Sequence, residues 1–149
     1  MDFFAQLFSN KVLWVSIFAC FLAQFIKIFT GKEKRIQIAR IVTSGGMPSS
    51  HSSLVCSLST AVYFNSGWNS DVFAVCLVLS LIVMYDAAGV RYAAGNQAKI
   101  LNKIMREWED KGTFDGEKYL KELLGHTPFQ VICGAVLGIF IGLLRHYII

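Results

Sequence analysis

Four long stretches without a charged residue dominate this sequence and restrict the folds that are open to it. They are residues 12–26, 51–70, 72–85 and 127–144. A helix needs roughly 20 apolar residues to cross a bilayer, and these stretches approach that length. Over the whole chain, 54% of residues are hydrophobic and only 16% are charged, which is unlike a water-soluble domain. The sequence therefore predicts an all-α fold, a polytopic membrane helical bundle.

We expect about four spans, at residues 11–29, 50–64, 72–94 and 128–146. The second is short and rich in serine, so it should run inside the bundle. Residues 95–110 carry their apolar side chains on one stripe, which predicts an amphipathic helix on the cytoplasmic face, lying along the membrane surface. Another short helix is expected over about 117–124. All 149 residues then form a single membrane domain.

The basic residues gather in the segment 27–43, which contains five lysines and arginines and one acid, Glu33. The positive-inside rule places this segment in the cytoplasm and, with four spans, both termini outside. The net charge of +4 then reflects membrane topology, and no nucleic-acid partner is expected. Membrane lipids are the expected partners, and a homo-oligomer remains open. Lys27 either extends to the membrane interface or turns inward toward an anion.

The cysteines give no sign of a disulfide or a metal site. All four lie inside apolar segments without Cys-x-x-Cys spacing, so we interpret them as buried small apolar residues. The sequence has no clustered carboxylates or Cys/His ligands. We therefore expect no metal and no other cofactor.

A polar turn, Ser44-Gly45-Gly46-Met47-Pro48-Ser49-Ser50-His51-Ser52-Ser53, leads into the second span. Its glycines allow close approach of backbone to a ligand, and Ser49 or Ser50 can cap the helix that follows. The free N–H groups and positive dipole end of that helix would face the turn, an arrangement that commonly binds phosphate. By itself the turn is equally consistent with a serine-rich entry to a membrane helix.

Two more polar groups flank the later spans. The third span ends in Tyr85-Asp86-Ala87-Ala88-Gly89-Val90-Arg91, where an acid and a base among small residues indicate either a functional site or a mutual ion pair. The last span follows Gly125-His126-Thr127-Pro128, in which Thr127 can cap the helix. Within that span, Gly134, Gly138 and Gly142 recur every four residues, which predicts a face for close helix packing.

In the predicted topology, these polar residues all fall on the cytoplasmic face of the bundle. A histidine at a helix N-terminus is disfavoured in its protonated form, so His51 and His126 can supply neutral imidazole near neutral pH. One can attack phosphorus while the other acts as an acid, and Arg91 and Lys27 would stabilise the phosphoryl oxygens. This combination predicts phosphoryl transfer without a metal.

The three polar blocks, in this order, resemble the divergent branch of the type 2 phosphatidic acid phosphatase superfamily, to which vanadium-dependent haloperoxidases are related. The resemblance covers nearly the whole chain and implies a membrane phosphatase that works through a phosphohistidine. It implies that His126 is the nucleophile, His51 the general acid, and Ser49 part of the phosphate site. Gln130 stands where mainstream members have an aspartate, so Asp86 or Glu122 is expected to replace that acid.

We therefore predict hydrolysis of a lipid-linked phosphate or prenyl diphosphate, which would make this protein an acid-phosphatase-type or lipid diphosphate hydrolase. The predicted catalytic residues are His126, His51 and Asp86. The predicted phosphate-binding residues are Ser49, Ser50, Gly46, Arg91 and Lys27. The alternative is a non-catalytic membrane protein that binds anionic lipid, or scaffolds a partner, through the same basic pocket.

Overall fold

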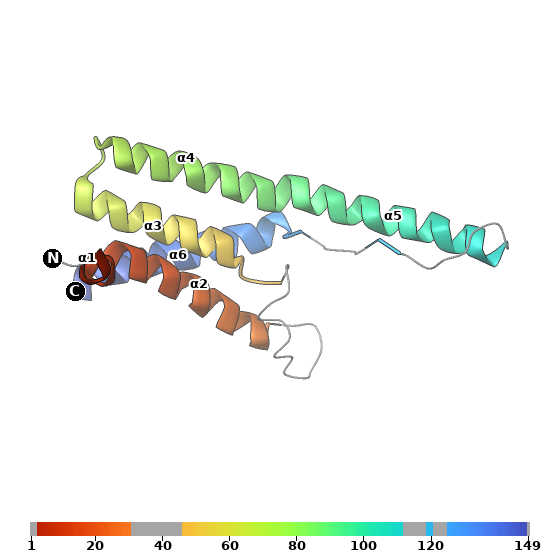
Figure 1. The fold of residues 1–149 in the computed structure, drawn as a ribbon, viewed down its shortest axis with the longest axis horizontal. Coiled ribbons are helices and arrows are strands. Elements are labelled where there is room, and N and C mark those ends of the chain that lie inside the picture. Colours follow the sequence, from red (N-terminus) through yellow and green to blue (C-terminus); the bar gives the residue numbers. More distant parts are fainter. Residues whose placement is uncertain (1–2, 31–45, 112–118, 121–124, 149) are drawn as a thin grey trace.

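The computed structural model describes residues 3–30, 46–111, 119–120 and 125–148. The described secondary structure is entirely helical (Figure 1). In chain order the elements are α1 (Phe3–Ser9), α2 (Lys11–Phe29), α3 (Ser50–Ser66), α4 (Asp71–Tyr85), the π-helical turn η2 (Asp86–Val90), α5 (Arg91–Asp110) and α6 (Pro128–Ile148).

Three of the described helices are long and apolar enough to cross a membrane: α2, the continuous helix Asp71–Asp110, and α6. The remaining long helix, α3, has 17 residues and packs against α2, α4 and α6 at the centre of the bundle (Figure 1). The expected serine-rich helix inside the bundle is therefore present. The prediction of an all-α membrane bundle is confirmed.

The bundle is apolar outside and contains small polar residues inside. Among the described residues, the largest side chains that are fully buried are all serines: Ser49, Ser50, Ser52, Ser53 and Ser57. Large hydrophobic side chains such as Phe21 and Ile82 are instead exposed on the outer surface. Lipid tails are as apolar as these side chains, so membrane helices associate through close packing of small residues rather than through burial of large ones.

The closest packing joins α3 to α6. A methyl group on Gly134 would lie 2.3 Å from the Ser49 carbonyl oxygen, and one on Gly138 would lie 2.3 Å from that of Ser53. One turn further on, a methyl group on Gly142 would lie 2.6 Å from Cβ of Thr60. The predicted glycine face is thus a contact surface, and it brings the α6 backbone directly against the α3 backbone.

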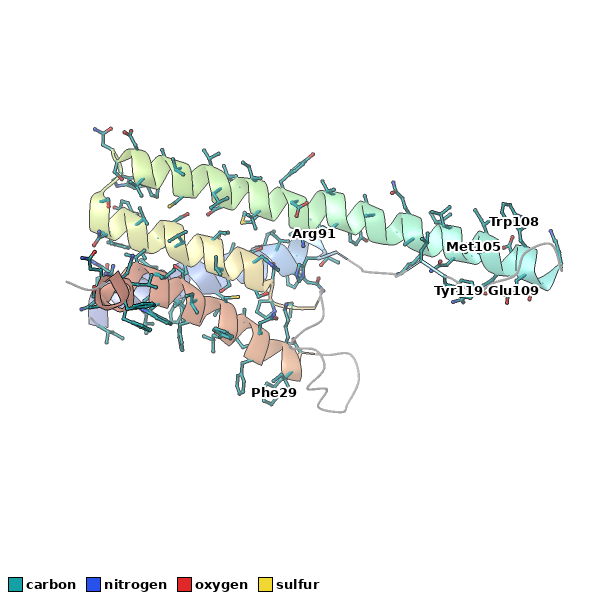
Figure 2. The ribbon with its side chains drawn as sticks, in the orientation of Figure 1. Phe29, Arg91, Met105, Trp108, Glu109 and Tyr119 are labelled. Carbon is teal, nitrogen blue, oxygen red and sulfur yellow. The ribbon has the colours of Figure 1, made fainter. Side chains whose placement is uncertain are left out.

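The third span and the amphipathic segment form one helix of 40 residues, Asp71–Asp110, about 60 Å long at 1.5 Å per residue. We expected a separate helix along the membrane surface. The structure instead extends α5 from α4 beyond the bundle, and Trp108 lies at the far end (Figure 2). The reason is that η2 keeps the backbone helical between them, and no proline interrupts this stretch.

The short helix expected near residues 117–124 falls mostly outside the described residues. Tyr119 and Leu120, which are described, are not helical, so the prediction is wrong for these two. Asn102 on α5 explains the difference. Its side-chain amide donates a hydrogen bond to the Leu120 carbonyl and accepts one from the Leu120 N–H, each at 2.8 Å. Those two backbone groups therefore bond to a side chain in place of a helical turn.

We expect Gly138→Ala to destabilise the bundle by about 1–3 kcal/mol, because the added methyl group forces the α3 and α6 backbones apart. The measurement is the free energy of unfolding in mixed detergent micelles. Gly89→Ala is the control, since a methyl group there meets no atom within 4 Å. Equal stability of the two variants would show that the α3–α6 contact is not tight.

Candidate active site

The polar residues singled out in the sequence lie at one end of the bundle. The C-terminal ends of α2 and α4 and the N-terminal ends of α3 and α6 meet there, opposite the α3–α4 turn and the C-terminal end of α6 (Figure 1). Arg91 marks this end in Figure 2. The other basic residues of the segment 27–43, together with Ser44, Gly45 and Glu122, lie outside the described residues.

Lys27, in the last turn of α2, points into the bundle. Its side chain is only 4% exposed, and Nζ donates to the Ser50 hydroxyl at 3.3 Å. Its methylene groups lie against Gly46, where a methyl group would be 3.7 Å from Cδ of Lys27. Of the two orientations that the sequence left open for this lysine, the structure has the inward one. Within the described ranges, no carboxylate pairs with this ammonium group.

The polar turn enters α3 through Gly46 and Ser49. Gly46 has φ of +84°, in the left-handed region that favours glycine. The Ser49 hydroxyl accepts hydrogen bonds from the backbone N–H of Ser52 at 3.4 Å and from its hydroxyl at 2.9 Å, so Ser49 is the N-cap. The N–H groups of Ser50 and His51 precede the first intrahelical hydrogen bond and point out of the helix end.

His126 is held from several sides and is only 6% exposed. Its Nδ1 lies 3.0 Å from the Gly46 carbonyl oxygen, and its backbone N–H donates to the Ala87 carbonyl in η2 at 3.2 Å. The preceding residue, Gly125, lies so close to α5 that a methyl group on it would be 2.3 Å from the backbone nitrogen of Tyr92. The imidazole is therefore fixed between the polar turn and the π-helical turn.

The contact with Gly46 also fixes the tautomer of His126. A carbonyl oxygen can only accept a hydrogen bond, so Nδ1 must carry a proton. In the neutral ring the lone pair is then on Nε2. This is the nitrogen that can act as a nucleophile or as a proton acceptor.

Residues Thr127 and Gln130 form a capping box at the start of α6. The backbone N–H of Thr127 donates to Oε1 of Gln130 at 3.0 Å, and that of Gln130 donates to the Thr127 hydroxyl at 3.4 Å. The predicted cap at Thr127 is therefore present. In addition, the backbone N–H of Ser49 donates to the Gln130 carbonyl at 3.0 Å. This bond joins the starts of the two helices that carry the histidines.

His51 lies in the first turn of α3, and its side chain is exposed. It is near enough to Arg91, Lys27 and Asp86 for their charges to act on it. The imidazoles of His51 and His126 are also within electrostatic reach of each other. One histidine of the pair is therefore accessible from outside, and the other is buried beside it.

Asp86 and Arg91 form an ion pair across η2. The Arg91 Nε donates to Oδ2 of Asp86 at 2.6 Å, and both side chains are partly exposed. A π-helical turn brings residues five apart onto the same face of the helix, which an α-helical turn does not do. The mutual ion pair that the sequence left open is therefore formed, at the edge of the histidine pair.

Burial lowers the pKa of His126 below its ordinary value, and the positive charge of Lys27 adds to this effect. Hydrogen bonds to Gln130 and to the Gly46 carbonyl act in the opposite direction without cancelling it. The ring is therefore mainly neutral near pH 7. No group of three or more His, Cys, Asp or Glu side chains that could hold a metal occurs in the described part of the chain.

Two site features were not predicted. One is the bond from His126 to the Ala87 carbonyl, for which the only signal was the run of small residues after Asp86. The other is the capping role of the Gln130 side chain, a residue that the resemblance marked only as standing in place of an aspartate. A threonine followed by glutamine three residues later is a known start signal for helices and indicated this role.

These features define a membrane helical bundle with a paired-histidine polar site at one end. The chain belongs to the Divergent PAP2 family, whose model matches residues 8–141. It is 36% identical to the "Uncharacterized membrane protein YuiD" of Bacillus subtilis (strain 168), over 95% of this chain and 98% of that protein. No solved structure matches the chain. The predicted resemblance to this divergent branch is confirmed.

We expect Lys27→Met to raise the pKa of His126, because it removes a positive charge that disfavours the imidazolium form. Histidine titration followed by NMR on protein labelled with nitrogen-15 in micelles measures this pKa. Lys11→Met is the control, since Lys11 lies at the opposite end of the same helix. An unchanged His126 titration in the Lys27 variant would contradict the described inward orientation of the lysine.

Proposed function

We propose that this protein hydrolyses a lipid-linked phosphate or diphosphate through a phosphohistidine intermediate, without a metal. The observation that carries the proposal is the buried Lys27 ammonium group beside the fixed imidazole of His126. A buried charge without an opposite charge is unfavourable, so a site of this kind favours an anion. Membership of the Divergent PAP2 family supports phosphatase-type chemistry for this anion.

In the first step, Nε2 of His126 attacks phosphorus and forms a nitrogen–phosphorus bond. The bond from phosphorus to the lipid oxygen breaks, and protonated His51 gives its proton to the leaving oxygen. Lys27, Arg91, the hydroxyls of Ser49 and Ser50, and the first N–H groups of α3 bind the phosphoryl oxygens. Gly46 brings its backbone close to them and holds Nδ1–H of His126.

In the second step, His51 accepts a proton from a water molecule that attacks the phosphohistidine. The nitrogen–phosphorus bond breaks, inorganic phosphate leaves, and His126 returns to its neutral form. The exposed position of His51 suits both transfers, because the leaving group and the water must enter from outside. Contact with the negatively charged phosphate would favour the protonated form of His51, and Asp86 orients Arg91 through their ion pair.

The substrate is amphiphilic in this proposal. The polar site lies at the end of a bundle whose outer surface is covered with large apolar side chains. A phosphate head group can enter this end while its hydrocarbon chain stays in the surrounding membrane. In this proposal the site faces the cytoplasm and both termini lie outside, because the positive-inside rule favours a cytoplasmic location for the basic segment that follows Lys27.

We expect His126→Ala to abolish phosphate release and formation of the phosphoenzyme, since it removes the nucleophile. His51→Ala should lower turnover of a lipid phosphate about 10²–10⁴-fold, the usual contribution of a general acid. The defect of His51→Ala should be much smaller with dinitrophenyl phosphate, whose leaving group needs no proton. The measurements are phosphate release in detergent and detection of the acid-labile phosphohistidine by mass spectrometry.

His146→Ala is the matched control, because His146 lies in the last turn of α6, at the opposite end of the bundle. Unchanged activity in both the His126 and the His51 variants would refute the mechanism. Binding of lipid phosphate to the unaltered protein without any turnover would favour the alternative function, a non-catalytic site for anionic lipid.

The pH profile gives a separate prediction. Because the pKa of His126 is lowered, kcat/KM should fall on the acid side with a midpoint below about 6.5, the ordinary histidine value. Activity is lost there because protonation removes the Nε2 lone pair. In the substrate complex, where the bound phosphate favours protonated His51, kcat should fall on the basic side as His51 loses this proton. Initial rates between pH 4.5 and 9 measure the acid-side and basic-side losses of activity. A midpoint of the acid-side loss above the ordinary histidine pKa would contradict a neutral buried nucleophile.

A further inference from the structure

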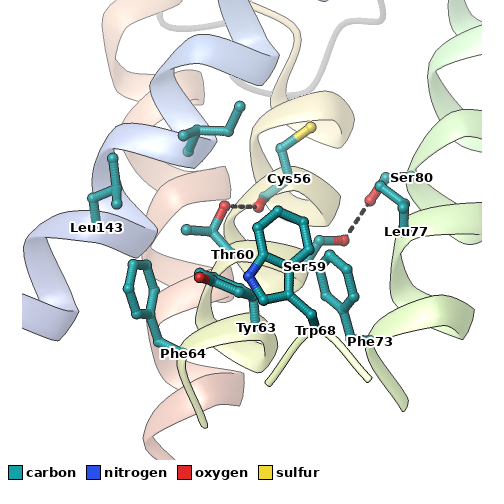
Figure 3. Close-up of a pocket in the computed structure, with 11 residues that line it drawn as sticks. Cys56, Ser59, Thr60, Tyr63, Phe64, Trp68, Phe73, Leu77, Ser80 and Leu143 are labelled. Carbon is teal, nitrogen blue, oxygen red and sulfur yellow. Dashed lines mark hydrogen bonds between the residues drawn. The ribbon is translucent and has the colours of Figure 1, made fainter. Parts of the chain in front are cut away.

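A hollow lies in the bundle, nearer the opposite end from the histidines. It is a groove of about 320 Å³ between α4 and α6, with α3 as its floor (Figure 3). The walls include aromatic and aliphatic side chains of all three helices and of the α3–α4 turn: Tyr63, Trp68, Phe73, Leu77, Ile139 and Leu143. Its volume is at the lower end of the range for small-molecule sites, about 300–1,000 Å³.

The serine and threonine hydroxyl groups in the wall are already hydrogen-bonded. The Ser80 hydroxyl shares its single proton between the Val55 and Cys76 carbonyls, each 2.9 Å away, and lies 2.8 Å from the Ser59 hydroxyl. Thr60 donates to the Cys56 carbonyl at 2.8 Å, as Figure 3 shows. A polar ligand would have to compete with these bonds. Apart from the Tyr63 hydroxyl and the Trp68 ring N–H at the aromatic end, the groove therefore suits a ligand that makes no hydrogen bonds.

The position of the groove indicates the source of such a ligand. Its two sides, α4 and α6, belong to helices long and apolar enough to cross a membrane, so lipid chains surround its opening. Tyr63, Trp68 and Phe73 form an aromatic cluster at one end, with ring centroids 4.7–5.9 Å apart. Tyrosine and tryptophan concentrate where the membrane meets water. This end of the groove then lies near the head groups, and the remainder lies at chain depth.

The groove is separate from the phosphate site. On α3, the far end of the groove at Tyr63 is twelve residues from His51, about 18 Å along the helix, and its near end at Cys56 is five residues away, about 8 Å. Cys56 and Met84, whose sulfur atoms are 3.6 Å apart, pack between α3 and α4 on the side of the groove toward the histidines. A lipid in the groove would therefore enter from the leaflet opposite to that of the proposed substrate.

We propose that this groove binds one hydrocarbon chain of a membrane lipid and does not select its head group. The polar loop beside the aromatic cluster, residues 65–71, contains no lysine or arginine that would attract an anionic head group. The bound chain fills the space between α4 and α6, which pack on α3 rather than along each other. It thus acts as a structural part of the bundle.

Photocrosslinking tests this site on the intact chain. The protein is purified in detergent micelles, and phosphatidylcholine with a diazirine in one acyl chain is added in increasing amounts. Mass spectrometry then identifies the labelled residues. We expect labelling at Leu77 and Leu143 that saturates with the amount of probe. Unlabelled phosphatidylcholine and phosphatidylglycerol with the same chains should compete equally well.

A pair of matched variants distinguishes the groove from general lipid contact. Leu77 and Leu79 lie on α4 and are both 43% exposed, but only Leu77 lines the groove. Leu77→Trp fills the groove and should reduce the saturable labelling of groove residues by the probe at least fivefold. Leu79→Trp should leave this labelling intact. Leu143→Trp fills the groove from α6 and replaces Leu77→Trp if that variant does not fold.

Two results would overturn the proposal. Labelling that rises linearly with the probe and is the same in the filled variants would mean that only bulk lipid contacts this surface. Much stronger competition by one of the two head groups would mean that the head group, and not the chain, is recognised. Neither result bears on phosphate release, because the two sites lie at different depths.

Discussion

The contact between the backbones of α3 and α6 is the interaction on which the rest of the structure depends. Glycines spaced by four residues on α6 face serines spaced by four on α3, and a single methyl group on Gly134 or Gly138 would collide with a carbonyl oxygen. In a membrane, apolar burial contributes little to helix association, so this close fit must supply the attraction. It also explains why serine, and not leucine, occupies the centre of the bundle.

The same contact positions the candidate site. Gly134 touches Ser49, and the Ser49 N–H bonds the Gln130 carbonyl, so packing and hydrogen bonding fix the two helix starts together. His51 follows Ser49 by two residues, and His126 precedes the first residue of α6 by two. Their relative position is therefore set by rigid elements. The third support comes from η2, where the Ala87 carbonyl accepts a hydrogen bond from the backbone N–H of His126.

Much of this arrangement could be predicted from the sequence, because it depends on patterns with a fixed period or a fixed end signal. Uncharged apolar runs identified the helices, and the spacing of Gly134, Gly138 and Gly142 identified the packing face. The parts that were missed depend on long-range contacts. Residues 86–90 carry no local signal for a π-helical turn, and the non-helical backbone at Leu120 follows from a bond to Asn102, 18 residues earlier. The direction of Lys27 is likewise decided by Ser50, from another helix.

The charges at the site explain how a glutamine can stand at position 130. Arg91 already has an acid partner in Asp86, whereas Lys27 has none among the described residues. A carboxylate at position 130 would make the same capping bond to Thr127 but would add a negative charge beside His126. In the proposed mechanism that charge would stabilise imidazolium, yet it would also repel a phosphate or diphosphate approaching the buried ammonium group. Glutamine keeps the cap and leaves the positive charge of Lys27 for the anion, so the proposed chemistry depends more on Lys27 and less on an acid behind the nucleophile.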